Sequence, residues 1–206
     1  MGINVSKSIS NVTSKIINEL EQSIGASATA NCSVVTGNII LKNANRCGVQ
    51  NENRCSANAS AALDAISKAA ASAWADASVQ QKTAILPGVN VNETSQNVAT
   101  IIASKLKQTC QSGSSLTQSI ATGDLILDGC TDSNITNINA GSAEANCGIK
   151  SIMNAIVQAD AKQQAGQITG DLFGSLFSNV GYVASGILLL CICLFIITVA
   201  ILFLKK

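Results

Sequence analysis

The chain has 206 residues, of which 47% are hydrophobic and 12% are charged, and its formal net charge is +1. A soluble domain usually has about 25% charged residues, and thirteen Lys and Arg spread over this length do not form a phosphate-binding stripe. The sequence has no His, which excludes His-based nucleophile pairs and His-ligated metal sites. We therefore predict a protein that is not an enzyme, with no catalytic residue, no metal and no nucleic-acid partner.

The N-terminus carries a lipidation signal. Residues 1–6 read MGINVS, which matches the myristoylation pattern M-G-x-x-x-[ST], with Gly2 as the acceptor after Met1 is removed. No apolar stretch nearby resembles a secretory signal peptide, which favours the lipid because myristoylation takes place in the cytosol. We predict covalent myristate on Gly2 and no other cofactor. The alternative is an unmodified terminus.

The first predicted elements are a long helix and short strands. Apolar residues recur every three or four positions from Val5 to Ile24, which predicts a helix that Gly25 ends. β-Branched residues predict short strands at Ser33–Thr36 and Asn38–Leu41, on either side of Gly37.

Three more helices follow from the same spacing. The first covers Ala59–Trp74, the second runs from Val91 to a point near Cys110, and the third carries Cys147 to Val157. The segment Gln81–Asn90 contains the Pro87-Gly88 pair, so we predict a connection there.

A short sequence occurs twice, 86 residues apart. Thr36–Leu41 reads TGNIIL and Thr122–Leu127 reads TGDLIL. Each copy follows a cysteine at the end of a helix and precedes another cysteine, the two pairs being Cys32 with Cys47 and Cys110 with Cys130. This indicates an internal duplication of a helix–sheet–helix unit, with chance similarity as the alternative. We predict an α+β fold, in which four or five helices pack on two small two-stranded sheets.

The C-terminal part is a predicted membrane anchor. Residues 183–204 contain no charge, and as a helix they would be about 33 Å long, enough to cross a bilayer. The alternative is a buried helix of a soluble protein. We divide the chain into an ectodomain (1–166), an amphipathic juxtamembrane segment (167–182), a transmembrane helix (183–204) and a basic end (205–206).

Six cysteines precede this span: Cys32, Cys47, Cys55, Cys110, Cys130 and Cys147. Their even number and the absence of C-x-x-C favour disulfides over zinc. Six cysteines allow fifteen pairings, and the sequence alone does not choose among them. Disulfides are unusual in a protein whose N-terminus is modified in the cytosol. Cys191 and Cys193, within the span, are interpreted as small apolar residues, with palmitoylation or a dimer disulfide as alternatives.

The sequence resembles a known viral family. The resemblance rests on the Met-Gly start, the spacing of Cys32, Cys47 and Cys55, and the spacing of Cys110 and Cys130. It also rests on local motifs, which are Cys55-Ser56-Ala57 before Leu63-Asp64-Ala65, Lys107-Gln108-Thr109-Cys110, Gly141-Ser142 before Asn146-Cys147, Ile149-Lys150, and Lys162-Gln163 before Ala165-Gly166. Together they resemble the myristoylated, disulfide-bonded virion membrane protein of the poxvirus entry–fusion machinery, which has relatives in other large DNA viruses.

The resemblance implies three disulfides, Cys32–Cys55, Cys47–Cys130 and Cys110–Cys147. It also implies a single-pass late protein whose ectodomain faces the cytosol during assembly and later forms the outer face of the virion membrane, with the C-terminus inside. A virus-encoded thiol oxidase system would make the disulfides there. The implied fold is a helix bundle packed on two small two-stranded sheets, with a pocket able to hold an acyl chain.

The expected function is a non-enzymatic role in virus entry and membrane fusion. The expected partners are the lipid bilayer and other viral membrane or entry proteins. The alternative is a structural tether between an internal virion membrane and a capsid shell, needed for assembly, in which case capsid proteins are partners.

Overall fold

The computed structural model describes residues 5–24, 36–56, 58–86, 88–110 and 115–164. All of them fall within one compact unit, Met1–Leu172. The helices are α1 (Val5–Ile24), α2 (Ala59–Ala75), α3 (Val79–Ile85), α4 (Ser95–Thr109), α5 (Ser115–Thr122) and α6 (Ala143–Gln164). The strands are β1 (Ile39–Lys42), β2 (Gly48–Asn53), β3 (Leu125–Asp128) and β4 (Asn134–Asn139). The predicted α+β class and the two two-stranded sheets are confirmed for this part of the chain.

The predicted apolar faces of the helices form the core. In α1, Ile9, Val12, Ile16 and Leu20 are all buried. This helix packs on α2, and α2 packs in turn on α4 and α6. Small residues let α2 and α6 approach each other closely. A Cβ added at Gly148 of α6 would come within 2.7 Å of Leu63 of α2, which is too close for a side chain there.

Two short helices, α3 and α5, were not predicted. The segment Gln81–Asn90 was expected to be a connection, but α3 covers its first half. Ser78 and Gln81 form a capping box at the start of α3, and this local signal was available in the sequence. Helix α4 begins at Ser95 rather than at Val91, because the side chain of Thr94 caps it by accepting a hydrogen bond from Asn97 N.

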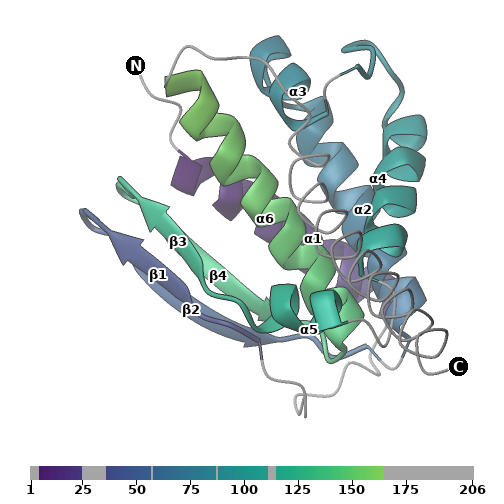
Figure 1. The fold of residues 1–206 in the computed structure, drawn as a ribbon, viewed down its shortest axis with the longest axis horizontal. Coiled ribbons are helices and arrows are strands. Elements are labelled where there is room, and N and C mark those ends of the chain that lie inside the picture. The colour runs from purple at the N-terminus through teal and green to yellow at the C-terminus, as the bar shows by residue number, and fades with distance from the viewer. Residues whose placement is uncertain (1–4, 25–35, 57, 87, 111–114, 165–206) are drawn as a thin grey trace, which may run out of the picture. The chain divides into compact units, whose positions relative to one another are not determined.

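The strands pair between the two copies of the repeat and not within them. Residues 39–53, which comprise β1, a turn and β2, are called the first ribbon. Residues 125–139, which comprise β3, a turn and β4, are called the second ribbon. The ribbons run parallel, and every pair from Ile39↔Leu125 to Asn53↔Asn139 has the offset of 86 residues. Figure 1 shows them side by side, with the first ribbon farther from the helices.

The same offset relates the helices. Val12, Ile16 and Leu20 of α1 correspond to Val98, Ile102 and Leu106 of α4, and all six are buried. In α2 and α6, Leu63 and Ile66 correspond to Ile149 and Ile152, which are also buried. The duplication therefore covers α1–β1–β2–α2 and α4–β3–β4–α6, much more than the six residues that first indicated it. This alignment corrects one detail, since Cys47 corresponds to Ser133 and not to Cys130.

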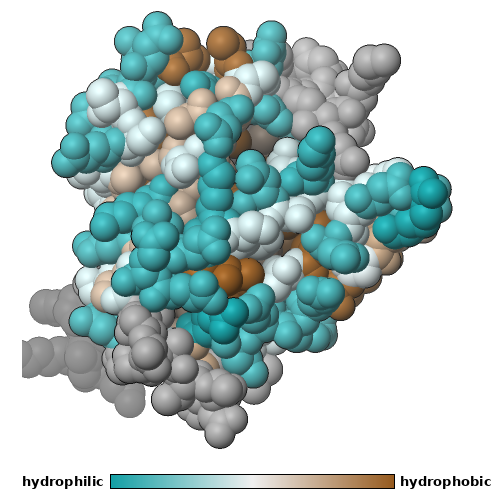
Figure 2. Space-filling model, turned by 180° about the vertical axis from the view of Figure 1, so that it is seen from behind, coloured by the Kyte–Doolittle hydropathy of each residue, from teal (hydrophilic) through white to brown (hydrophobic). Residues whose placement is uncertain are grey.

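The surface of the described residues is largely polar. Figure 2 shows a mostly hydrophilic face with small, separate hydrophobic areas. The exposed large hydrophobic residues in the described ranges are Ile40, Val79 and Ile126. The described ranges contain no helix that is long and apolar enough to cross a bilayer. The predicted span at 183–204 lies outside them.

Candidate functional site

The two ribbons turn at equivalent positions and with the same backbone conformation. Asn43 and Arg46 in the first turn have positive φ angles of 46° and 54°. Their counterparts 86 residues later, Gly129 and Asp132, have φ angles of 79° and 48°. Few residues other than Gly and Asn adopt this conformation, so its occurrence at both positions of both turns supports the duplication.

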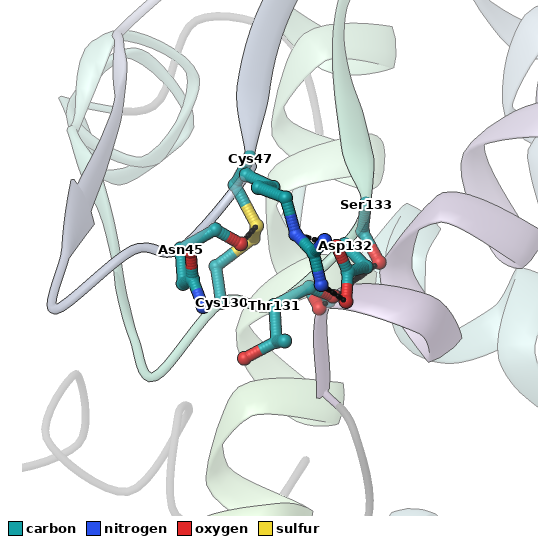
Figure 3. The surroundings of a disulfide bond; sticks show 8 residues. Asn45, Cys47, Cys130, Thr131, Asp132 and Ser133 are labelled. Carbon is teal, nitrogen blue, oxygen red and sulfur yellow. Dashed lines mark hydrogen bonds and ion pairs between the residues drawn. A yellow bond between two sulfur atoms is a disulfide. The ribbon is translucent and has the colours of Figure 1, made fainter.

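A disulfide joins the two turns. Cys47 and Cys130 are bonded, with Cα atoms 6.2 Å apart and a sequence separation of 83. Figure 3 shows this bond between the two ribbons, beside Asn45, Thr131, Asp132 and Ser133. Cys130 is buried, whereas Cys47 is partly exposed. The bond covalently links the two copies of the repeat.

Acidic side chains of the second copy accept hydrogen bonds from the first. The Arg46 guanidinium contacts both carboxylate oxygens of Asp132, at 2.5 and 2.8 Å. Asn43 Nδ2 donates to Asp128 Oδ1 at 2.7 Å, and Asn38 N donates to Asp124 Oδ1 at 2.9 Å. The first ribbon thus supplies donors and the region around the second supplies carboxylates. The side chain of Lys42, beside Asp128 in the register, has no hydrogen bond or ion pair in the described part of the chain.

A buried lysine holds the start of the first ribbon. Lys150 in α6 is 2% exposed, and its Nζ donates to Gly37 O at 3.0 Å and to Asn38 O at 3.3 Å. Burial lowers the pKa of Lys150 to about 8, and Asp124 opposes this shift. The ammonium is therefore tied to backbone carbonyls, as a buried cation must be to offset its lost hydration.

Asparagine side chains form further buried hydrogen bonds near Lys150. Asn137 Nδ2 donates to Gly37 O at 3.1 Å and to its register partner Asn51 at 3.0 Å. Asn146 of α6 donates to Asn139 Oδ1 and accepts from Ala140 N. Polar side chains of β4 and α6 therefore fix the ribbons against the helices at defined positions.

A second disulfide lies in the core. Cys110, at the end of α4, is bonded to Cys147 in α6, with Cα atoms 5.7 Å apart. Both cysteines are fully buried beside Ala121 of α5. The bond fixes the end of α4 to α6.

These two disulfides are two of the three pairs that the family resemblance implies. The third pair, Cys32–Cys55, stays a prediction because Cys32 lies outside the described residues. The same applies to Gly2, which lies before the start of α1 at Val5, and to Cys191 and Cys193. The described ranges contain no group of three or more side chains suited to hold a metal ion.

Comparisons with known proteins identify the family. Residues 3–203 match the family model described as "Lipid membrane protein of large eukaryotic DNA viruses". The chain belongs to this family. It is 30% identical over 200 residues to the "Entry-fusion complex associated protein" of fowlpox virus (strain NVSL), covering 93% of this chain and 81% of that one. It is 29% identical over 175 residues to the protein of the same name from vaccinia virus (strain Western Reserve), covering 79% and 70%.

Membership of this family confirms the resemblance to the poxvirus proteins. It makes this chain a viral membrane protein.

Sequence reasoning missed the structural importance of Lys150, Asn137 and Asn146. Lys150 and Asn146 were noted only within family motifs. One signal was available, because a single Lys stands among Cys147, Ile149 and Met153 on an otherwise apolar stretch of α6. The helical spacing of the apolar residues in that stretch predicts the helix but gives Lys150 no role.

Proposed function

We propose that this chain is a permanently anchored component of the virion membrane that acts, with other viral membrane proteins, in virus entry and membrane fusion. The observation that carries the proposal is the similarity to the fowlpox virus protein named for its association with the entry-fusion complex, over 93% of this chain. The expected orientation places the ectodomain on the outer face of the virion membrane.

In this proposal the anchor has two parts with different tasks. A single myristoyl chain binds a bilayer only marginally, so the span at 183–204 supplies the permanent attachment. Myristate on Gly2 is then available for another task, either in an apolar pocket or in a target bilayer. Mass spectrometry of the N-terminal peptide tests the lipid, and an unmodified or acetylated Gly2 would contradict it.

The disulfide-linked ribbons are better suited to binding partner proteins than to catalysis. The two turns, the Cys47–Cys130 bond and the buried polar contacts hold a fixed surface on which partners can dock. We include Cys32–Cys55 as the third bond of this framework. Peptide mapping without reduction tests it, and a free thiol at Cys32 would contradict it.

Repression of the gene during infection tests the function. We expect virions that form in normal number and attach to cells but do not fuse with them, and re-expression of the wild-type chain should restore infectivity. Failure to assemble particles or shells would contradict an entry role and would favour the alternative, a tether between the membrane and a capsid. Re-expression of the Gly2→Ala variant separates the role of the lipid from that of the ectodomain.

A further inference from the structure

Among the described residues, the first ribbon has one edge paired with the second ribbon and one edge without a strand. Each sheet in the described residues has two strands, β1–β3 and β2–β4. Leu125 N donates to Asn38 O and Gly129 N donates to Lys42 O, so the even-numbered residues 38 to 42 direct their backbone groups to β3. Because these groups alternate along a strand, those of Ile39 and Leu41 point to the other side.

The second ribbon differs, because helices pack against it. Helix α1 contacts β4, Ser6 Oγ donates to Ser133 Oγ at 3.2 Å, and α6 contacts both β3 and β4. Figure 1 shows the first ribbon on the side away from these helices. The unpaired edge of the first ribbon is thus the one that lies away from these helices in the described part of the chain, and unpaired edges of this kind readily accept another strand.

The side chains along this edge combine apolar and basic character. Ile40 is 40% exposed and is the register partner of Ile126, which is 47% exposed, so the two form one apolar patch on the open face of the sheet. Lys42 is exposed and its ammonium has no partner in the described ranges. Arg46 is also exposed, although it is paired with Asp132.

The molecule itself shows which kind of strand fits the first ribbon. The second ribbon pairs with it in parallel through the sequence Leu125–Asp128, and its Asp128 and Asp132 lie opposite Lys42 and Arg46. Acidic residues four positions apart therefore match the basic residues four positions apart on the first ribbon. Because the register neighbours of a parallel sheet share a face, a strand on the open side would meet the same two cations.

We propose that the open edge of the first ribbon is a docking site for a partner protein, which adds an extended, parallel strand with apolar residues followed by acidic residues spaced four apart. Main-chain hydrogen bonds to Ile39 and Leu41 supply the attachment, and Ile40, Lys42 and Arg46 supply the selectivity. The inference goes beyond the proposed function, because such a partner could serve either virus entry or assembly.

A peptide copy of the second ribbon tests the site. The probe is a fluorescent peptide of residues 123–139 with Cys130→Ser, titrated with the full-length chain in detergent and followed by anisotropy. We expect saturable binding. In the proposed register the peptide uses the backbone N–H groups of its residues 126 and 128, so methylating these two nitrogens should abolish binding. Methylating the nitrogens of 125 and 127 should leave it, because those groups face away from β1.

Charge exchange tests the selectivity. Lys42→Glu should weaken binding about two- to fivefold, which is the range for one exposed ion pair, and a peptide with Asp128→Lys should recover the loss. Lys68→Glu, on the exposed face of α2, is the matched control and should have no effect. The Lys42 side chain makes no hydrogen bond or ion pair in the described part of the chain, so the variant removes no contact of the first ribbon and should fold as the wild type does.

Three outcomes would overturn the proposal. One is the absence of saturable binding, which would mean that the edge is closed in the full chain. Another is equal loss from both pairs of N-methyl groups, which would mean that the peptide adheres without strand pairing. The third is a dimer of the chain that forms through its first ribbons and excludes the peptide, which would make the occupant a second copy.

Discussion

The two ribbons have the same backbone course but different environments. Leu41 of the first is partly exposed, whereas its counterpart Leu127 in the second is buried. At the equivalent positions Val49 and Ile135 the contrast is the same. The difference arises because α1 and α6 pack against the second ribbon. The duplicated sequence therefore gives the two ribbons the same local conformation, while the helices that pack on a ribbon decide how far it is buried.

The helices after the ribbons show the same contrast. Asp64 of α2 and Lys150 of α6 are equivalent at the offset of 86 residues. Asp64 is exposed and forms an ion pair with Lys107, whereas Lys150 is buried against the start of the first ribbon. Equivalent positions have thus diverged according to what covers them.

Removing the Cys47–Cys130 disulfide between the ribbons should have the largest effect on stability. With Cys47→Ala and Cys130→Ala together, the free energy of unfolding should fall by about 4–5 kcal/mol, because the bond closes a long loop in the unfolded chain. Guanidinium unfolding, followed by the fluorescence of Trp74, measures it, since Trp74 is the single Trp and is buried. Cys191→Ala with Cys193→Ala serves as a control. A loss below about 1 kcal/mol would show that the ribbons hold together without the bond.

The same truncation in the two ribbons should give unequal losses. Leu127→Ala should destabilise the fold by about 3 kcal/mol, since a buried Leu loses its contacts and leaves a cavity. Leu41→Ala, at the equivalent but partly exposed position, should cost about 1 kcal/mol. Unfolding curves of the two variants give the difference directly. Equal losses would mean that the first ribbon is covered in the full chain.

Lys150 should make the stability depend on pH. Its pKa is about 8 in the folded state and 10.5 when unperturbed. Between these values the unfolded chain binds more protons, so the free energy of unfolding should rise with pH. The gain between about pH 7.5 and 10 should be about 2 kcal/mol. Unfolding of wild type and Lys150→Met at a series of pH values isolates this contribution, because other groups titrate in both. Parallel profiles would refute it.

The apolar patch formed by Ile40 and Ile126 should contribute least to the free energy of unfolding. Ile40→Thr and Ile126→Thr should each change the free energy of unfolding by less than about 0.5 kcal/mol, because both side chains are exposed and Thr suits a strand. The same unfolding assay measures them. A larger loss at Ile40 alone would indicate that a segment of the full chain packs on the first ribbon.

Much of the helical fold could be predicted from the sequence. The apolar stripe of α1 and the Ala-rich pattern of α2 depend on residues three and four positions apart, and the structure buries those residues. The strands β2 and β4 were not predicted, because GVQNEN and NITNIN contain little of the β-branched alternation that marks a strand. Their pairing with each other supplies the hydrogen bonds that their composition does not indicate.

The candidate site was predictable only in part. The cysteines were evident, but the pairs Cys47–Cys130 and Cys110–Cys147 came from the family resemblance, because spacing along the chain does not reveal distance in space. The role of Lys150 could not be predicted from its neighbours, since its hydrogen-bond acceptor Gly37 O lies 113 positions away.

By itself, the sequence determined the amphipathic helices, the offset of 86 residues and the membrane-protein character, because each depends on local spacing or composition. Only the tertiary structure decided that the two copies pair strand to strand in parallel, and that in the described part of the chain the second ribbon is more buried than the first. These outcomes depend on contacts between residues far apart in the chain. Whether a residue is buried depends on which distant segments of the chain pack against it.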